Sequence, residues 1–320
     1  MSRLSSASGP LARSITWRAS RHTYYTIQLL ADRDRVLDAF RAYAYFRWVD
    51  DQIDLHQTIE SERLDFVARQ ADLLEAAYHN TQPECTTPTE QMLIELIGRD
   101  PRPESGLAGY LRNMMDVMQF DAGRRGRWIT QAELDGYTRS LALAVTDALH
   151  YFIGHGQPVP RTPARTAAVS AAHITHMLRD TSEDVAAGYY NIPLELLAGE
   201  GLAPENLAHP GYRAWARQRV AQARRGFELG KAHLARVASR RCRLAGFAYC
   251  ARFEGVLDAI EGNHYDLTTP LPPAFLASGR AWRTLAAALS PLPRARPRPR
   301  APSEAAPRSR PPLPRADRSP

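Results

Sequence analysis

The stretch that decides the fold is residues 36–54, VLDAFRAYAYFRWVDDQID. Its apolar residues recur at the three- and four-residue spacing of a helix with one face against a core: Val36, Leu37, Phe40, Tyr43, Ala44 and Phe46. At its end Asp50 and Asp54 stand four residues apart, so both carboxylates project from one side of the helix. The stretch therefore predicts a core helix with an acidic last turn.

The same periodicity covers most of the remaining chain, with breaks where Pro, Gly and polar residues cluster. It runs through Leu64–Tyr78, Met92–Ile97, Leu107–Phe120, Leu134–Phe152, Ala164–Thr181, Tyr212–Val237 and Leu244–Ile260. Alternating strand patterns are few, and no repeat of 20–50 residues is found. We expect an all-α bundle with a flexible N-terminus at residues 1–12, a helical domain at 13–289 and a disordered tail at 290–320.

Composition narrows the class of protein. The chain has 320 residues, 44% of them hydrophobic, enough for a sizeable core. No apolar run is long enough to predict a membrane span, and the N-terminus does not read as a secretory signal. The three cysteines, Cys85, Cys242 and Cys250, match neither a disulfide framework nor a zinc site, which fits a reducing cytoplasm.

The formal net charge of +7 sits almost entirely in the tail. Residues 291–320 hold eight Arg against Glu304 and Asp317, together with ten prolines. The rest of the chain is close to neutral, which argues against nucleic-acid binding. The tail cannot bury enough surface to order itself. It is either simply solvated or a contact for acidic lipid or an SH3-like partner through PPLPR.

A second acidic cluster is Arg179-Asp180-Thr-Ser-Glu183-Asp184. It also ends an apolar helix pattern, and its aspartates are again four residues apart. Paired carboxylates one turn apart repel each other, whereas Mg²⁺ is held by one or two carboxylates plus phosphate oxygens. A solvated acidic helix end is the alternative for either cluster alone. Two clusters of matching spacing favour two walls of one metal-diphosphate site.

Read in full, these two elements resemble the squalene/phytoene synthase family. Residues 43–54, YAYFRWVDDQID, are similar to its YAxxR-xxDDxxD segment, and residues 175–184, THMLRDTSED, with Gly188 and Ile192-Pro193, to its TNxLRDxxEDxxxG…LP segment. A weaker match is the helix around Phe253 and Asp258. The resemblance spans about Trp17 to Tyr265. It implies the class I isoprenoid synthase fold, a helical bundle around a deep apolar cavity.

The resemblance also implies a site. By carry-over, the ligands of two or three Mg²⁺ ions would be Asp50, Asp54, Asp180 and Asp184. The catalytic group would be Tyr43, Arg47, Asp51, His176, Arg179 and Glu183. The substrate pocket would be lined by Tyr24, Phe40, Tyr137, His173, Asn191 and Phe253, although ordinary core packing is the alternative for each aromatic residue.

The implied reaction is the head-to-head joining of two prenyl diphosphates, farnesyl or geranylgeranyl, through a cyclopropyl diphosphate to a squalene- or phytoene-type C30 or C40 hydrocarbon. Whether NADPH takes part stays open. We expect a cytoplasmic monomer or weak dimer, with peripheral contact to the inner face of a membrane as an option, because long prenyl products partition into lipid.

The chain departs from the family pattern in ways that concern the product. His173 and His176 stand where the family has Gln and Asn, Tyr189 and Asn191 replace its Arg and Tyr, and residues 141–150 lack its glycines. His176 could donate to diphosphate as a cation or orient Asp180. A transition-metal pair of the two histidines is a further option. A single-substrate terpene cyclase or lyase, or a non-catalytic assembly scaffold, therefore stays as an alternative function.

Overall fold

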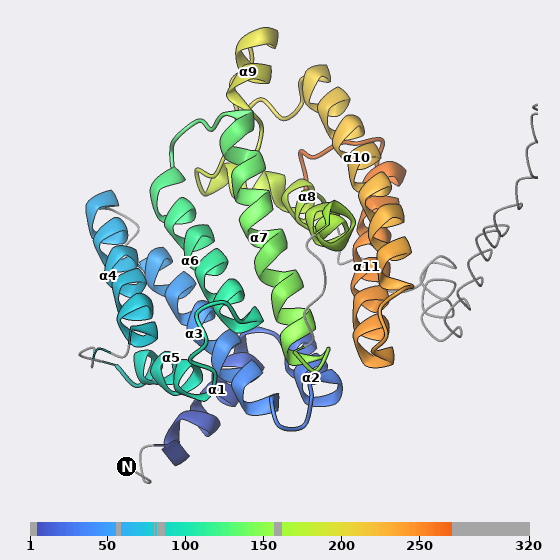
Figure 1. Ribbon diagram of the computed structural model, residues 1–320. Helices are drawn as coiled ribbons and strands as arrows, with labels where there is room; N and C mark the ends of the chain where they lie inside the picture. Colours follow the sequence, from blue (N-terminus) through green and yellow to red (C-terminus); the bar gives the residue numbers. More distant parts are fainter. Residues whose placement is uncertain (1–4, 56–58, 80, 82–86, 157–161, 271–320) are drawn as a thin grey trace, which may run out of the picture.

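The computed structural model describes residues 5–55, 59–79, 81, 87–156 and 162–270, and its regular structure there is entirely helical (Figure 1). The helices are α1 (Ser5–Ala19), α2 (Arg21–Leu30), α3 (Val36–Leu55), α4 (Glu60–Tyr78), α5 (Pro88–Arg99), α6 (Gly106–Arg124), α7 (Gln131–Phe152), α8 (Pro163–Ala186), α9 (Leu194–Glu200), α10 (Pro210–Leu234) and α11 (Arg240–Gly262). The predicted all-α class is confirmed. Cys85, the end of the predicted domain at 271–289 and the tail at 290–320 lie outside the described residues.

Two buried clusters make up the core, and α7 lies between them. One cluster joins α1 to α6 with the C-terminal end of α7, and the other joins the N-terminal end of α7 to α8, α10 and α11. Tyr137 and Leu149 of α7 pack against both clusters. Figure 1 shows α7 through the middle of the bundle, with α9 at one end and α1 and α2 at the other. The central position of α7 places its side chains against both halves.

The helical part begins earlier than the expected boundary at residue 13. Helix α1 starts at Ser5, and Ser8 is buried where its hydroxyl donates to Glu95 Oε2 at 2.6 Å. The Arg41 guanidinium donates to Ser8 Oγ at 3.0 Å and pairs with Glu95 at 2.8 Å. Small residues carry no apolar periodicity, so the pattern did not reveal this helix, yet they allow close packing. A Cβ added at Gly9 would lie 3.1 Å from Leu37.

Small residues also bring α8 and α10 together. A Cβ added at Gly230 would lie 2.5 Å from the Cβ of Ala168, and one at Gly226 would lie 2.9 Å from that of Ala171. Such distances require that these positions stay glycine, because a real Cβ would overlap its neighbour. Helix α8 carries the second acidic cluster, so this packing fixes where that cluster lies.

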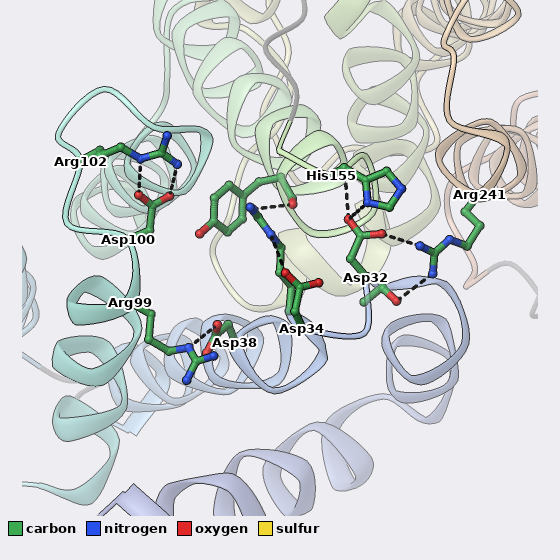
Figure 2. Close-up of polar contacts among 11 residues, drawn as sticks. Asp32, Asp34, Asp38, Arg99, Asp100, Arg102, His155 and Arg241 are labelled. Atoms are coloured by element: carbon green, nitrogen blue, oxygen red, sulfur yellow. Dashed lines mark hydrogen bonds and ion pairs between the residues drawn. The ribbon is translucent and has the colours of Figure 1, made fainter.

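Polar contacts hold the end of the bundle that contains α2 (Figure 2). Asp32, which follows α2, accepts from the backbone N–H of His155 at 2.8 Å and from Arg241 Nη2 of α11 at 2.6 Å. Its own N–H donates to Phe152 O at 2.8 Å. Nearby, Asp38 of α3 pairs with Arg99 of α5 at 2.8 Å. A single buried carboxylate therefore ties the end of α2 to the ends of α7 and α11.

Among the described residues, no helix combines the length and the apolar character that a bilayer crossing requires.

Candidate active site

The last turns of α3 form the first acidic wall. Arg47 Nη1 donates to Asp50 Oδ2 at 3.1 Å, and the same guanidinium pairs with Asp51. The pairing is local, because all three residues lie on one helix, and it is partly solvated, because the Arg47 side chain is 39% exposed. Asp54 follows one turn later and is exposed. One arginine therefore organises this wall through contacts within its own helix.

The last turns of α8 form the second acidic wall. The Arg179 guanidinium donates two hydrogen bonds to the Asp180 carboxylate, at 2.6 and 2.7 Å. His176 Nε2 lies 3.1 Å from Asp180 Oδ2, the oxygen that also accepts from Arg179 Nη2. Burial lowers the pKa of His176, so a neutral ring lies beside this carboxylate. Of the two roles considered for His176, a cationic donor to diphosphate and a residue that orients Asp180, this arrangement fits the second. Glu183 is exposed.

Asp184, the last aspartate of α8, is held from outside its helix. Asn191 Nδ2 donates to Asp184 Oδ2 at 2.7 Å. Arg124 Nη1 of α6 in turn donates to Asn191 Oδ1 at 2.9 Å, and Arg124 Nε donates to Asp121 Oδ1 at 2.6 Å. Tyr137 of α7 donates its hydroxyl to Asp121 Oδ2 at 3.0 Å. A network from three elements therefore fixes Asp184.

Asp121 also couples the two walls electrostatically. Burial raises the pKa of Asp50 to about 6, and the charges of Asp54 and Asp121 add to the rise. Burial likewise raises the pKa of Asp184 to about 7, with Asp180 and Asp121 contributing. The pKa of Asp54 is raised by burial and by Asp51 and Asp121. The carboxylates of α3, α6 and α8 thus share one field of excess negative charge.

This donor set fits a hard divalent cation bridged to a diphosphate. The side chains are carboxylates, and the pKa values of Asp50, Asp54 and Asp184 are raised by burial first and by neighbouring carboxylates second. A cation bound among them would stabilise their charged forms. Within the described part of the chain, no three side chains of the metal-binding types meet closely enough to hold an ion by themselves. Mg²⁺ commonly keeps positions for phosphate oxygens alongside one or two carboxylates. Two separated walls suit that chemistry better than a closed protein cage.

Two of the expected pocket residues lie beside the walls. Tyr137 packs against Phe120 with ring centroids 4.9 Å apart and against His173 at 4.7 Å. Burial lowers the pKa of His173 to about 3, so this imidazole is neutral, and its Nδ1 has no hydrogen-bond partner. His173 therefore packs as a neutral ring against Tyr137, which in turn packs against Phe120.

The other expected residues are more dispersed. Phe253 of α11 contacts Tyr249 and lies 6.4 Å from the His176 ring. Tyr24 and Phe40 pack together at 5.0 Å in the core of the first half, where Phe40 is fully buried. Tyr43 lies in the same core, close enough to Arg47 to raise its pKa. The structure therefore places Tyr24 and Phe40 in packing positions.

The interior holds an apolar pocket of about 150 Å³ between α2, α7, α8 and α11. Its walls include Leu30, Leu149, Val169 and Tyr249. Leu149 follows Tyr137 by twelve residues, about 18 Å along α7, so the pocket lies deep below the acidic walls. A deep cavity that joins this pocket to the aspartates is not seen among the described residues.

Asp121 and Arg124 are the site residues that sequence reasoning missed. Asp121 directly follows the apolar pattern Leu107–Phe120, which is the same signal that marked the two aspartate pairs. It is a single carboxylate without a partner four residues away, so it carried no spacing signal. Arg124 is one arginine in a chain rich in arginine, and only its burial distinguishes it.

Fold and site together define a class: an all-helical protein with acidic clusters at the ends of α3 and α8 that both feel the charge of Asp121. The family model for squalene/phytoene synthase matches residues 17–284. The chain belongs to the squalene/phytoene synthase family, which makes it a prenyltransferase. The alternatives of a terpene cyclase and a scaffold are not favoured by this membership.

Relatives and solved structures agree with this assignment. A phytoene synthase of Thermus thermophilus is 29% identical over 141 residues, 43% of this chain and 47% of that protein, so this match spans about half of the relative. A 15-cis-phytoene synthase of Synechocystis is 25% identical over 296 residues, 85% of this chain and 83% of that protein.

Among solved structures, squalene synthase HpnC of Alicyclobacillus acidocaldarius superposes with a TM-score of 0.64 at 19% identity, covering 81% of this chain and 95% of that one. A dehydrosqualene synthase in complex with a ligand gives the same TM-score at 16% identity, covering 88% of this chain and 95% of that one. These structures confirm the isoprenoid synthase fold.

Proposed function

We propose that this protein catalyses the Mg²⁺-dependent head-to-head condensation of two prenyl diphosphates, farnesyl or geranylgeranyl, to a C30 or C40 hydrocarbon. The observation that carries the proposal is the pair of acidic walls on α3 and α8, with Asp121 between them and the pKa values of Asp50 and Asp184 raised to about 6 and 7. A bound cation would stabilise these carboxylates in their charged forms at neutral pH, and a metal-bridged diphosphate supplies one.

In this proposal Asp50 and Asp54 hold metal on one side of the substrate, and Asp180 and Asp184 hold it on the other. Bound Mg²⁺ would supply the positive charge that makes diphosphate a good leaving group. Arg47 and Arg179, both partly exposed at the walls, can turn donors toward the diphosphate oxygens. Arg124 and Asn191 keep Asp184 in place.

The chemistry then follows from ionisation. The C1–O bond of one substrate breaks, and its electron pair leaves with the diphosphate. The C2–C3 double bond of the second substrate attacks the allylic cation, and loss of a proton closes a cyclopropyl diphosphate. The second diphosphate leaves, and the rearranged cation ends by losing a proton or by taking a hydride from NADPH. The neutral, buried ring of His173 and the Tyr137 ring beside it give a dry wall that keeps water from the cations.

The test is product formation from C10, C15 and C20 prenyl diphosphates with Mg²⁺, with and without NADPH, followed by mass analysis of the hydrocarbons. The Asp50→Ala, Asp180→Ala double variant is the blank, and Asp65→Ala, an exposed aspartate of α4, is the matched control. We expect a C30 or C40 product from the wild type and the control only. A product built from one substrate, or release of no diphosphate, would refute the proposal.

A further inference from the structure

Helix α2 carries two neighbouring stripes with different surroundings. Residues His22, Thr26 and Leu30, spaced by four, line the apolar pocket of about 150 Å³. The adjacent stripe is Arg21, Tyr25 and Leu29, also spaced by four and therefore on one face. This second stripe points to solvent, with Tyr25 52% and Leu29 71% exposed. The two stripes run side by side along α2, so the thickness of one helix separates exposed apolar surface from the wall of the pocket.

Trp17 of α1 extends the exposed stripe into a patch. Its ring lies 5.8 Å from that of Tyr25, and the Arg21 guanidinium lies 5.2 Å from the Trp17 centroid. Trp17 is itself 39% exposed. We call Trp17, Arg21, Tyr25 and Leu29 the α1–α2 patch. An exposed set of large hydrophobic side chains in mutual contact marks an interaction surface, whereas single exposed ones need no explanation.

The charge around the patch is positive. Helices α1 and α2 contain Arg13, Arg18 and Arg21 and no acidic residue. Arg252 of α11 lies close enough to His22 to lower the pKa of that imidazole, in addition to the effect of burial. Trp and Tyr at an apolar surface with arginines beside them are the composition of proteins that rest in the headgroup region of a bilayer.

We propose that the α1–α2 patch docks on the surface of an anionic bilayer. A second copy of the chain fits poorly, because a symmetric contact would bring together two patches whose helices carry arginines and no acidic residue to pair with them. A bilayer instead offers acidic headgroups to the arginines and an apolar boundary to Trp17, Tyr25 and Leu29. Docking here places the pocket wall of α2 next to the lipid, which suits a protein that handles prenyl chains.

The first test measures binding of the full-length protein to vesicles of phosphatidylcholine alone and to vesicles that also contain about 30% phosphatidylglycerol. We expect binding to the anionic vesicles only. The Tyr25→Glu, Leu29→Glu variant should lose roughly tenfold or more of that binding. The matched control places glutamate at exposed leucines elsewhere, Leu64→Glu, Leu229→Glu, and should bind as the wild type does.

Arg18→Gln, Arg21→Gln should lower binding to the anionic vesicles by roughly tenfold. The eight arginines of residues 291–320 would also attract anionic lipid. They are present in every variant, so any loss of binding in the patch variants reports the contribution of the patch itself. Unchanged binding of the Tyr25→Glu, Leu29→Glu variant would overturn the proposal. A dimer that this variant dissociates, without vesicle binding by the wild type, would assign the patch to a second copy instead.

A second test reports where the bilayer contacts the protein. Lipids brominated on the acyl chains quench only tryptophans that enter the apolar region. The chain has five tryptophans, and Trp17 and Trp128 are both exposed. We expect quenching that disappears in Trp17→Phe and persists in Trp128→Phe. Quenching that survives Trp17→Phe would place the contact elsewhere and refute the proposal.

Discussion

The two acidic walls carry the same sequence spacing but are held in different ways. On α3 the carboxylates of Asp50 and Asp51 are paired by Arg47 of the same helix, in a partly solvated setting. On α8, Asp184 depends on Asn191 and on the buried Arg124 of α6. Local pairing at a helix surface is weak and easily rearranged, whereas a buried network fixes geometry. The Asp50 end of the first wall can therefore rearrange more easily than Asp184 of the second.

The largest expected effect comes from breaking either wall at its aspartate. Asp50→Asn and Asp184→Asn should each lower kcat by about 10²- to 10³-fold, because each removes the charge of a proposed metal ligand while keeping the shape of the side chain. Steady-state assays of product formation measure this. Asp116→Asn on the exposed side of α6 is the control. Activity within a factor of three of the wild type in either variant would show that the wall does not hold metal.

Removing the arginine of each wall separates the two ways of holding it. Arg124→Met should destabilise the fold by about 3 kcal/mol, since Asp121 would stay buried without its charge partner. Arg47→Met should cost less than about 1 kcal/mol, because its pairs are partly exposed. Chemical denaturation of both variants measures the difference. Equal losses of stability would contradict the contrast between a fixed and an adjustable wall.

The pH dependence of stability is a third test. Burial raises the pKa values of Asp50 and Asp184 to about 6 and 7 from 3.8. These two carboxyl groups therefore bind more protons in the folded protein than in the unfolded chain between about pH 4 and 7, and their contribution to stability without metal falls as the pH rises. The buried rings of His150 and His173, with pKa values lowered to about 4 and 3, contribute in the opposite sense, so the carboxyl contribution is read from the difference between the wild type and a variant. Asp184→Asn should remove part of this fall, worth about 1 kcal/mol after allowance for solvent screening.

Thermal unfolding of the metal-free protein at pH 4.5, 6 and 8 follows this effect. Mg²⁺ with a non-hydrolysable diphosphate analogue should recover stability at pH 8 and have little effect at pH 4.5, where Asp50 and Asp184 are protonated. Asp184→Asn should gain stability relative to the wild type as the pH rises from 4.5 to 8, and a difference that stays constant over that range would contradict the raised pKa of Asp184.

The smallest effect is expected at His173. This imidazole is neutral and buried, and its Nδ1 has no partner, so His173→Phe loses no hydrogen bond at that atom and keeps an aromatic contact with Tyr137. We expect a change in stability within about 1 kcal/mol and activity within roughly threefold. Product assays and denaturation check both. A large loss of kcat with normal stability would show that the imidazole touches the reacting atoms.

The sequence revealed most of the fold because apolar spacing on a helix reflects which side is buried. It did not reveal the helix at Ser8–Ala12, where Ser8 and Ala12 are buried but too small to produce a hydrophobic pattern. The sequence also revealed both aspartate pairs. Two carboxylates four residues apart on a core helix repel each other, and this unfavourable spacing can be recognised in the sequence. Asp121 and Arg124 escaped because each is a single residue whose importance lies in its neighbours from other helices.

The sequence by itself determined the helical class, the two acidic walls and the resemblance to the squalene/phytoene synthase family, since all three depend on spacing within one segment. Only the tertiary structure decided that Asn191 and Arg124 hold Asp184 and that Tyr25 faces solvent. Those properties depend on which distant segments meet. The close approach of α8 to α10 and the burial of Arg124 between α6 and the loop after α8 are set by packing, which spacing along one helix does not encode.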